Sequence, residues 1–494
     1  MNFRQNTKKE TEMVFGLIGP IGCNRQLVID TFTKLAPHYG YTAIKIGLSS
    51  IITEHVQLPP HNDDQYTRVS DLMSAGSELR KRTNDNSILA KLAAVKIKQN
   101  RNNNNKTIYI IDSLKHPEEI EELRNIYGLG FYLFALHSSE ERREKYLKND
   151  CLIADKSKRR ELIERDKDEK LGYGQSTSEA FHRADFFLSE NGDSTKLWNV
   201  IERFLDLIFG HPFKTPTFQE HAMYMAYSAA TRSADMSRQV GAVITNKTDI
   251  LTTGANECPS PGGGTYWPKF DAYDHSIEDI KDGRDYTTGI DRNGKEKKLI
   301  EDAILKDIPP EISEQLKKNI QTSGLNDITE YGRVVHAEMD AILSCARRGI
   351  STLGTVLYCS THPCHNCAKH IVASGISQVI YIEPYPKSKA IDMHKDSIRT
   401  PDDKSNSDNR VVFTPFIGVG PRIYVNLFSM TQGFGEKTKR KKSGAYEKAS
   451  WERIKAFPRL KIFDTSYINN EKIVETESEK LLKNIDPIII EKSK

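Results

Sequence analysis

Short apolar runs alternate with longer polar or amphipathic stretches through the first part of the chain. The apolar runs, each the length of a single strand, are residues 13–18, 42–46, 108–111 and 130–136. Strands that alternate with helical segments are typical of a parallel sheet joined by crossover helices. The pattern therefore predicts an N-terminal α/β domain over residues 1–210.

A second series of elements follows a proline-containing segment, residues 211–216, which we expect to be a linker. Its expected elements are a helix at 218–231 and strands at 239–245, 250–253, 355–359 and 378–382. A charged insert that begins Gly- and Pro-rich, residues 257–332, interrupts the series, and a lysine-rich extension, residues 431–494, ends the chain. We therefore expect a second α/β domain over residues 211–430.

Three residues of the second domain have the chemistry of zinc ligands. His336, Cys364 and Cys367 offer one nitrogen and two sulfurs. A tetrahedral zinc ion with three protein ligands keeps its fourth position open for water, which is typical of a catalytic site. If a helix begins at Pro363, both sulfurs project from its first turn, where the positive helix end favours thiolates. A structural zinc knuckle would need a fourth ligand at short spacing, and none stands out.

Glu338 follows His336 by two residues, too close to join it easily as a ligand but well placed to reach water at the open position. His-x-Glu combined with Pro-Cys-x-x-Cys is the signature of zinc-dependent nucleobase deaminases, in which the glutamate moves protons. The signature predicts Zn²⁺ as cofactor and Glu338 as proton shuttle. A noncatalytic sensor that kept zinc for folding is the weaker interpretation, because Glu338 is intact.

The turn after the first apolar run resembles a P-loop in a degenerate form. Where Gly-x-x-x-x-Gly-Lys-Ser/Thr requires its last three residues, the chain has Asn24, Arg25 and Gln26. A guanidinium and the amides at a helix N-terminus still attract phosphate, although the hydroxyl ligand for magnesium is missing. Phosphotransfer, nucleotide binding without turnover and a purely scaffolding role all stay open. The candidate nucleotide-binding residues are Gly19, Gly22, Asn24, Arg25 and Asp112.

Whole-chain composition narrows the class of protein. With 494 residues, 28% charged and 37% hydrophobic, the chain can build several domain cores. Its seven cysteines are odd in number and form no disulfide pattern, which indicates a reducing compartment. No signal-like segment or membrane-length apolar run is present, so we expect a cytoplasmic protein without a membrane partner. A formal net charge of +4 disfavours a surface that coats nucleic acid.

Further runs carry a family resemblance. Residues 238–243 and 254–256 resemble the opening hairpin of the deoxycytidylate deaminases. Nearly the whole chain, up to about residue 430, resembles the bacterial antiviral (anti-phage) dCTP deaminases, which fuse a P-loop-kinase-like domain to a deaminase of that family. The runs that carry the larger resemblance are 19–25, 111–117, 256–257, 262–264, 266–267, 284–286, 335–339, 383–388 and 416–422.

The resemblance implies a P-loop-kinase-like parallel sheet followed by a cytidine-deaminase-like α/β/α sandwich. It implies deamination of dCTP or dCMP, with release of ammonia and depletion of dCTP as an antiviral defence. It also implies restraint in uninfected cells by a small RNA in some systems, and we expect a regulatory nucleotide at the N-terminal domain and a homo-oligomer.

The resemblance also suggests residues that contact the substrate. Asn256 would hold the sugar or base, or is a turn residue. Arg238 and Lys387 would contact phosphate, or are ordinary surface cations. Tyr385 would stack on the base, or only packs.

A nucleic-acid editing deaminase uses the same zinc chemistry and is the competing interpretation. It would act on tRNA adenosine or on a single-stranded substrate. Such an enzyme needs a basic, aromatic-bearing groove for the strand. The lysine-rich run at residues 437–442 is the only hint of one, whereas the long insert and the kinase-like first domain favour a free nucleotide.

Overall fold

The chain forms two compact units, each discontinuous in sequence. The computed structural model describes residues 11–60, 64–101, 106–167, 169, 172–190, 192–323, 331–383, 385, 389–403, 409–435, 437–442, 447–460 and 464–490. Unit 1 comprises Met1–Glu220, Glu383–Pro386 and Pro415–Lys494, and unit 2 comprises His221–Ile382 and Lys387–Thr414. Unit 1 therefore draws on three separate parts of the chain, including most of the C-terminal extension. Residues 99–106 are low in complexity, which predicts an exposed loop, and the four asparagines of this segment, 102–105, lie outside the described residues.

Unit 1 contains a parallel sheet of five strands. They are β1 (Met13–Ile18), β2 (Thr42–Gly47), β4 (Thr107–Leu114), β5 (Phe131–His137) and β6 (Phe186–Ser189). The spatial order is β2-β4-β1-β5-β6, and β15 (Gly418–Val419) adds to β6 in antiparallel register. The four strands predicted from apolar runs are confirmed, because β1, β2, β4 and β5 coincide with those runs.

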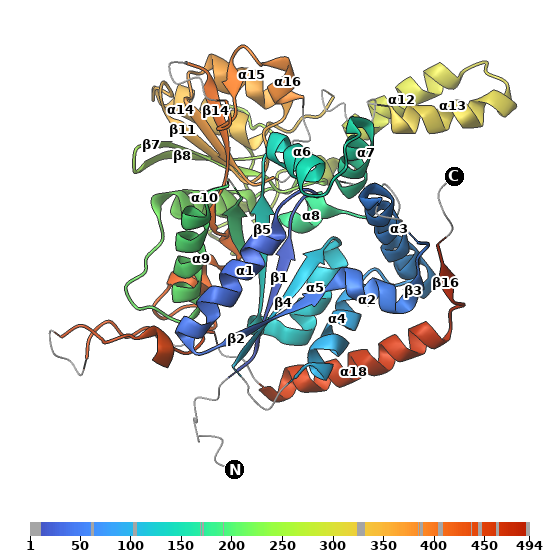
Figure 1. Ribbon diagram of the computed structural model, residues 1–494. Coiled ribbons are helices and arrows are strands. Elements are labelled where there is room, and N and C mark those ends of the chain that lie inside the picture. Colours follow the sequence, from blue (N-terminus) through green and yellow to red (C-terminus); the bar gives the residue numbers. More distant parts are fainter. Residues whose placement is uncertain are drawn as a thin grey trace. The chain divides into compact units, whose positions relative to one another are not determined.

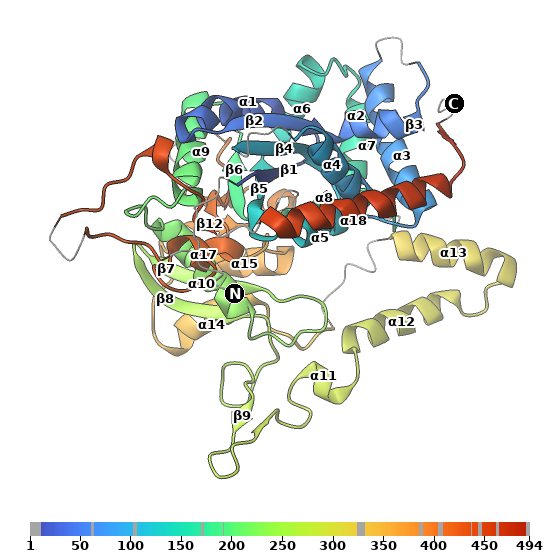
Figure 2. The same ribbon diagram turned by 90° about the horizontal axis from the view of Figure 1, so that it is seen from below.

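Helices cover both faces of this sheet. Helices α1 (Arg25–Leu35) and α9 (Ser194–Ile208) pack on one face, and α4 (Ile88–Gln99) and α5 (Pro117–Tyr127) on the other (Figures 1 and 2). The remaining elements of the unit are α2 (Leu48–His55), β3 (Val56–Gln57), α3 (Gln65–Thr83), α6 (Glu140–Asn149), α7 (Lys156–Lys167), α8 (Thr177–Phe181), α17 (Tyr424–Phe428), α18 (Asp464–Lys483) and β16 (Ile488–Ile489). No helix in the described part of the chain is both long and apolar enough to cross a membrane.

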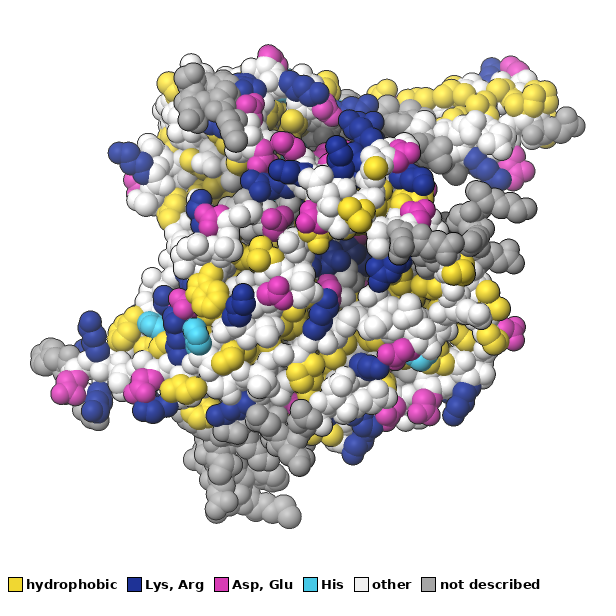
Figure 3. Space-filling model, viewed as in Figure 1, with side chains coloured by type: hydrophobic (Ala, Val, Ile, Leu, Met, Phe, Trp, Pro, Cys, Tyr) yellow, Lys and Arg dark blue, Asp and Glu magenta, His cyan; other side chains and the backbone are white. Residues whose placement is uncertain are grey.

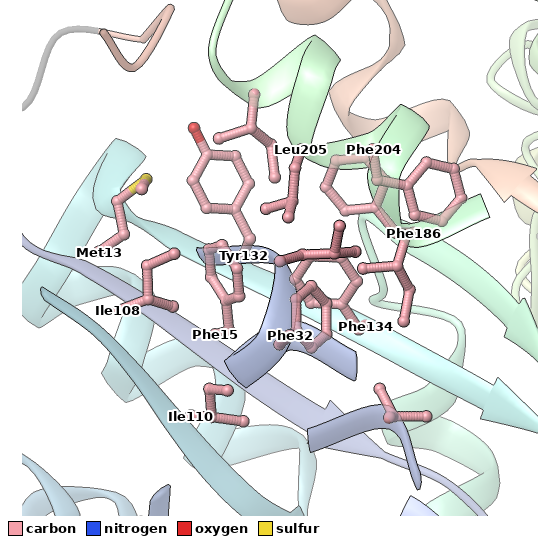
Figure 4. Packing of buried hydrophobic residues seen from close by; sticks show 14 of the residues in the cluster. Met13, Phe15, Phe32, Ile108, Ile110, Tyr132, Phe134, Phe186, Phe204 and Leu205 are labelled. Atoms are coloured by element: carbon pink, nitrogen blue, oxygen red, sulfur yellow. The ribbon is translucent and has the colours of Figure 1, made fainter. Parts of the chain in front are cut away.

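Aromatic side chains from β1, β5, β6 and α1 form the centre of the unit 1 core (Figure 4). The rings of Phe134 and Phe186 stack with centroids 4.8 Å apart, and Phe15 lies 5.0 Å from Phe134 and 5.2 Å from Phe32. Burial of such large apolar surfaces stabilises the sheet and fixes the position of α1 on it.

The C-terminal extension contributes helix α18 to unit 1, where it packs on α4 and α5 (Figure 2). Glu471 of α18 is fully buried and accepts two hydrogen bonds from the guanidinium of Arg101, at 2.7 and 2.8 Å. It also accepts a hydrogen bond from the hydroxyl of Tyr127 at 2.9 Å. A bidentate pair buried in this way ties the end of the chain to the first domain.

Unit 2 is built on a mixed sheet in the order β13-β14-β12-β11-β7-β8. Its strands are β7 (Gly241–Asn246), β8 (Asp249–Ala255), β11 (Val356–Cys359), β12 (Gln378–Tyr381), β13 (Ile398–Arg399) and β14 (Val411–Pro415). β7 is antiparallel to β8 and β11, whereas β11 and β12 are parallel. The four strands expected for this domain are thus confirmed.

Two glycines let helices approach opposite faces of the unit 2 sheet. At Gly241, an added Cβ would lie 1.9 Å from the carbonyl oxygen of Ala226 in α10 (Phe218–Ala230). At Gly254, it would lie 2.3 Å from the carbonyl oxygen of Ala337 in α14 (Ala337–Arg347). Since Gly254 pairs with Ala242, the neighbour of Gly241, the two glycines face opposite sides of the sheet. The helix α15 (His365–Ala373) shares a core with α14, and α16 (Ala390–Met393) contacts α15.

The insert forms its own small elements within unit 2. These are β9 (Lys269–Phe270), β10 (Ile277–Glu278), α11 (Asp285–Thr288), α12 (Arg292–Leu305) and α13 (Pro310–Thr322). α12 and α13 contact one another as a helical hairpin, on which hydrophobic side chains remain in view (Figure 3). Leu299, Ile304 and Ile312 are among the exposed residues of this hairpin.

Candidate zinc and catalytic site

His336 is held at the N-terminus of α14, where it is the N-cap residue with an extended backbone. The residue before it, Val335, exchanges two backbone hydrogen bonds with Glu257, at 3.2 and 3.0 Å. Because Glu257 lies two residues after β8, this bridge anchors His336 near the end of that strand.

The two cysteines lie at the start of α15. Cys364 is its N-cap, with φ −72° and ψ 167°, and Cys367 lies in the first turn. The helix begins at His365, two residues later than a start at Pro363 would place it, because Cys364 keeps an extended backbone. Both sulfurs are nevertheless at the positive end of the helix, as expected from their spacing.

The three predicted ligands meet at one point. Nδ1 of His336 lies 3.3 Å from Sγ of Cys364 and 3.3 Å from Sγ of Cys367, and all three donor atoms lie within 4.8 Å of one another. Zinc bonds of roughly 2.0 Å to nitrogen and 2.3 Å to sulfur put tetrahedral donors about 3.5 Å apart. The donor set and its spacing therefore fit a zinc ion with three protein ligands.

The same residues perturb one another electrostatically. Hydrogen bonds from Cys367 and His336 lower the pKa of Cys364 to about 4, which favours its thiolate. That thiolate accounts for the largest effect on His336, whose pKa is raised to about 8 despite burial. A low thiol pKa suits metal binding, because the thiolate is the form that coordinates the ion.

Glu338 lies in the first turn of α14 and is 3% exposed. Burial is the main cause that raises the pKa of its carboxyl, and the nearby Cys364 thiolate adds to the effect. A carboxyl with a raised pKa is protonated more readily than an ordinary one, which favours a role as general acid as well as general base. The structure thus places an acid-base group on the same helix turn as the His336 ligand.

Asp340 is a positioning residue that the sequence analysis did not single out. Its carboxylate accepts a hydrogen bond from the backbone N–H of Ala255 at 3.2 Å, which joins α14 to the end of β8. Burial raises the pKa of this carboxyl. Its spacing in the sequence could have revealed it, because a residue four positions after His336 lies one helical turn further on the same face.

Asn256 links two neighbouring segments of unit 2. Its Oδ1 accepts a hydrogen bond from the N–H of Val240 at 2.7 Å, and its Nδ2 donates one to the carbonyl of Arg238 at 2.7 Å. An asparagine amide has one further N–H and one further lone pair after two such bonds. The side chain therefore orders the start of β7 and retains one donor and one acceptor site.

The other predicted substrate contacts lie in different settings. The side chain of Arg238 is exposed, and its backbone N–H donates to Asp235 at 3.0 Å. Tyr385 belongs to unit 1, is 3% exposed and donates its hydroxyl hydrogen to Asp166 at 2.5 Å. Lys387 lies outside the described residues.

The segment that resembles a degenerate P-loop has the predicted strand-turn-helix context. Gly19 begins the turn after β1, and Asn24 caps α1 by accepting the N–H of Leu27 at 3.1 Å. The Nε of Arg25 donates to Asp112 at 2.9 Å. Gly22 has φ +86°, a conformation that favours glycine. The structure thus gathers the five candidate nucleotide-binding residues around the carboxyl ends of β1 and β4.

Comparison with known proteins agrees with the site. Residues 216–383 match the family model described as the cytidine and deoxycytidylate deaminase zinc-binding region. This match and the converging His, Cys and Cys ligands define a zinc-dependent deaminase domain of the cytidine and deoxycytidylate type.

Two phage enzymes and one solved structure are among the similar proteins. The deoxycytidylate deaminase of Enterobacteria phage T4 is 30% identical over 179 residues, which cover 34% of this chain and 78% of the phage protein. The deoxycytidylate deaminase of phage T2 is 29% identical over 167 residues, which cover 34% of this chain and 80% of the phage protein. A crystal structure of the cyanophage S-TIM5 dCMP deaminase in complex with dCMP and dUMP aligns with 20% identity and a TM-score of 0.23, covering 41% of this chain and all of that one. The chain belongs to the deoxycytidylate deaminase family.

Proposed function

We propose that this protein removes the exocyclic amine of deoxycytidine nucleotides, converting dCTP to dUTP and dCMP to dUMP with release of ammonia. The observation that carries the proposal is the buried carboxyl of Glu338 beside the converged His336, Cys364 and Cys367. The family relationship to deoxycytidylate deaminases supports the same substrate class.

The reaction consumes one water: the C4–N bond of cytosine breaks, a C4=O bond forms and ammonia leaves. Zinc, when bound, supplies Lewis acidity that lowers the pKa of a coordinated water toward roughly 7. Glu338 takes the proton of the attacking water, delivers it to N3 of the base, and then passes a second proton to the departing amine. His336 and the two cysteines hold their positions at two helix N-termini throughout.

The proposal that the triphosphate is the preferred substrate rests on two points. They are the resemblance to dCTP deaminases and the exposed guanidinium of Arg238. Arg238 is tied through its carbonyl to Asn256, so a phosphate contact at Arg238 would be coupled to the ordered start of β7. The proposed biological role is depletion of dCTP during phage infection.

A nucleic-acid editing activity has weaker support. The sequence feature that could hold a strand is the lysine-rich run at 437–442. Lys442 in this run pairs with Glu447 at 3.9 Å, which reduces its availability for a phosphate backbone.

A substrate panel tests the proposal. Zinc-loaded protein is assayed for ammonia release with dCTP, dCMP, deoxycytidine, CTP and a cytosine-bearing oligonucleotide. We expect the highest kcat/KM for dCTP, followed by dCMP. Activity on the oligonucleotide alone would instead establish the editing function.

The biological role is tested in infected cells. Nucleotide pools are measured after phage infection in bacteria that express the wild-type protein or the Glu338→Gln variant. We expect dCTP to fall and deoxyuridine nucleotides to rise with the wild-type protein only. Equal pools in both strains would exclude the proposed defence.

A further inference from the structure

The carboxylate of Asp166, on α7, is buried against the turn formed by Gly19–Arg25. Its Oδ2 accepts hydrogen bonds from the backbone N–H of Ile21 at 2.9 Å and from the hydroxyl of Tyr385 at 2.5 Å. Its Oδ1 pairs with the ammonium of Lys115 at 2.6 Å, and Asp166 is 1% exposed. A backbone amide, a hydroxyl and a lysine are also the donors by which proteins commonly hold a phosphate group.

Lys115, which directly follows β4, contacts the same turn. Its ammonium also donates to the carbonyl oxygen of Gly19 at 2.7 Å, which fixes it at the carboxyl end of β1. Burial lowers the pKa of Lys115, and the Asp166 carboxylate opposes this shift. The buried ammonium of Lys115 thus depends on a negative charge at the position that Asp166 occupies.

Arg143 provides a second, independent sign of an anion site. It is 2% exposed, and its guanidinium lies 4.9 Å from the ring centroid of Tyr385. Its Nε donates to the carbonyl of Ser138 at 3.2 Å, whereas Nη1 forms no hydrogen bond within the described part of the chain. Burial raises the pKa of the nearby Cys23 thiol, and Arg143 is the first of the charges that oppose this shift. A buried cation with an unused donor favours an anion next to it.

The backbone of the turn suits such a ligand. An added Cβ at Gly22 would lie 2.8 Å from the carbonyl oxygen of Arg143, so the turn and α6 are in direct contact. The turn leads into the N-terminus of α1, whose amides attract negative charge. In the sheet, β1 lies between β4 and β5, and ligands of doubly wound sheets bind at the carboxyl ends of the strands at such a switch point.

We propose that the Gly19–Arg25 turn is a phosphate-binding site whose internal occupant is Asp166. A phosphate group binds there by taking the Ile21 amide and Lys115 from Asp166, and this exchange releases the hydroxyl of Tyr385. Arg143 then gains an anionic partner for its unused donor.

The exchange has a consequence along the chain. Tyr385 follows β12 of unit 2 by four residues, so its release removes a hydrogen bond close in sequence to a strand of the deaminase sheet. Phosphate binding in unit 1 would thus affect unit 2 through the covalent chain. This coupling rests on the proposed deaminase function, whereas phosphate binding does not.

The internal carboxylate also explains how the site stays closed to weak ligands. An apparent dissociation constant equals the intrinsic one divided by the fraction of molecules in the open state. While Asp166 occupies the site, that fraction is small, so the apparent affinity of every phosphate ligand is reduced by the same factor and only a ligand of high intrinsic affinity binds.

Calorimetric titration with inorganic tripolyphosphate tests the site without reference to deamination. Asp166→Asn removes the competing charge, and we expect it to bind tripolyphosphate at least about ten-fold more tightly than the wild type, because the open state is no longer disfavoured. Glu164→Gln, on the exposed face of the same helix, is the matched control and should bind like the wild type. Equal or weaker binding by Asp166→Asn would overturn the proposal.

Tyr385→Phe provides a milder second variant if Asp166→Asn does not fold. It removes only the hydroxyl that holds Asp166, so its affinity should lie between those of the wild type and Asp166→Asn. An affinity equal to that of the wild type would contradict the exchange. GTP, which carries the same phosphate chain, should compete with tripolyphosphate if nucleotides are the natural source. Failure of GTP to compete would leave a free polyphosphate as the ligand and would still support the site.

The coupling is measured with dCMP as substrate, which avoids adding a second triphosphate. Tripolyphosphate should change the deamination rate of the wild type and should have a reduced effect on Tyr385→Phe. An equal effect on both proteins would exclude the route through Tyr385. The two proposals can fail separately. If the wild type does not deaminate dCMP but Asp166→Asn still binds tripolyphosphate more tightly than the wild type, the deaminase function is refuted and the phosphate site is supported.

Discussion

Gly254 packs directly against Ala337, at the start of the helix that carries the candidate proton shuttle Glu338. A Cβ at position 254 would lie 2.3 Å from the carbonyl oxygen of Ala337 and 2.5 Å from the nitrogen of Ala341. The helix α14 can approach β8 this closely only because residue 254 has no side chain. The bare backbone at Gly254 thus determines how near His336 and Glu338 lie to the end of β8.

Gly254→Ala should displace α14 and weaken the zinc site. Forcing a methyl group into a packed interface typically costs about 1–3 kcal/mol, and here both near neighbours are backbone atoms. We expect a lower melting temperature together with a reduced zinc content, measured by atomic emission. Gly172→Ala, where nothing lies within 4 Å of an added Cβ, is the control that should keep both properties. Full zinc content and unchanged melting in Gly254→Ala would contradict this packing.

Glu338→Gln should keep zinc and lose deamination. The substitution preserves size but cannot move protons, and general acid-base catalysis contributes roughly 100- to 10,000-fold. We expect kcat to fall within that range while metal content stays at one zinc per chain. Glu278→Gln, at an exposed position of the insert, should be fully active. Wild-type turnover by Glu338→Gln would remove this residue from the mechanism.

Cys364→Ser should release zinc. A serine hydroxyl does not ionise near neutral pH, so one of the three converged donors is lost. The loss of affinity should exceed the roughly 10- to 100-fold that is typical of changes beyond the ligands themselves. Competition with a chromogenic chelator measures it. Cys151→Ser, a free cysteine of unit 1, should retain wild-type affinity. Equal affinity in both variants would show that Cys364 does not coordinate the ion.

Asn256→Ala should destabilise unit 2 and raise KM. It removes the hydrogen bonds to Val240 and Arg238, and leaving buried groups unsatisfied costs about 1–3 kcal/mol. Asn256→Asp keeps the acceptor for Val240 but loses the donor to Arg238, so its stability should be intermediate. Chemical denaturation and steady-state kinetics measure the two effects. A raised KM without any loss of stability would indicate a direct substrate contact alone.

His116 should make the stability of unit 1 depend on pH. Its Nδ1 accepts the N–H of Glu118 at 3.3 Å and caps α5, and burial is the main cause that lowers its pKa. The fold thus favours neutral imidazole, so this stabilisation is complete above the ordinary pKa of 6.5 and is lost as pH falls through the lowered value.

His116→Asn keeps a capping acceptor and does not titrate. Urea denaturation between about pH 7 and about pH 5 should therefore show a smaller loss of stability than in the wild type. The exposed His38→Asn should behave like the wild type. Identical pH profiles for His116→Asn and the wild type would refute the assignment.

Much of the architecture could be predicted because it is local. The apolar runs at β1, β2, β4 and β5 predicted strands at nearly their observed bounds, since a buried parallel strand needs continuous apolar residues. The spacing of Cys364 and Cys367 likewise predicted a shared helix turn. The first residue of that helix could not be predicted as precisely. Pro363 is compatible both with a helical first turn and with the extended segment that the structure shows.

Other features depend on residues that are distant in sequence. The burial of α18 through Glu471 and Arg101 was not foreseen, because a lysine-rich, polar extension is usually a solvated surface. Asp340 and Asn256 acquired their backbone partners only when β7, β8 and α14 came together. The predicted domain boundaries at residues 210 and 430 remain predictions, and the two compact units are built from interleaved segments of the chain.

The sequence by itself determined the zinc chemistry, because residue types and short spacings decide which donors and which acid are available. It also determined the class of each domain, because hydrophobic periodicity follows directly from the order of residues. Only the tertiary structure decided what those groups contact: it brought His336 to 3.3 Å from Cys364, and it placed Asp166 on the amide of Ile21, 145 residues away. Such contacts follow from packing between distant segments, which no local pattern specifies.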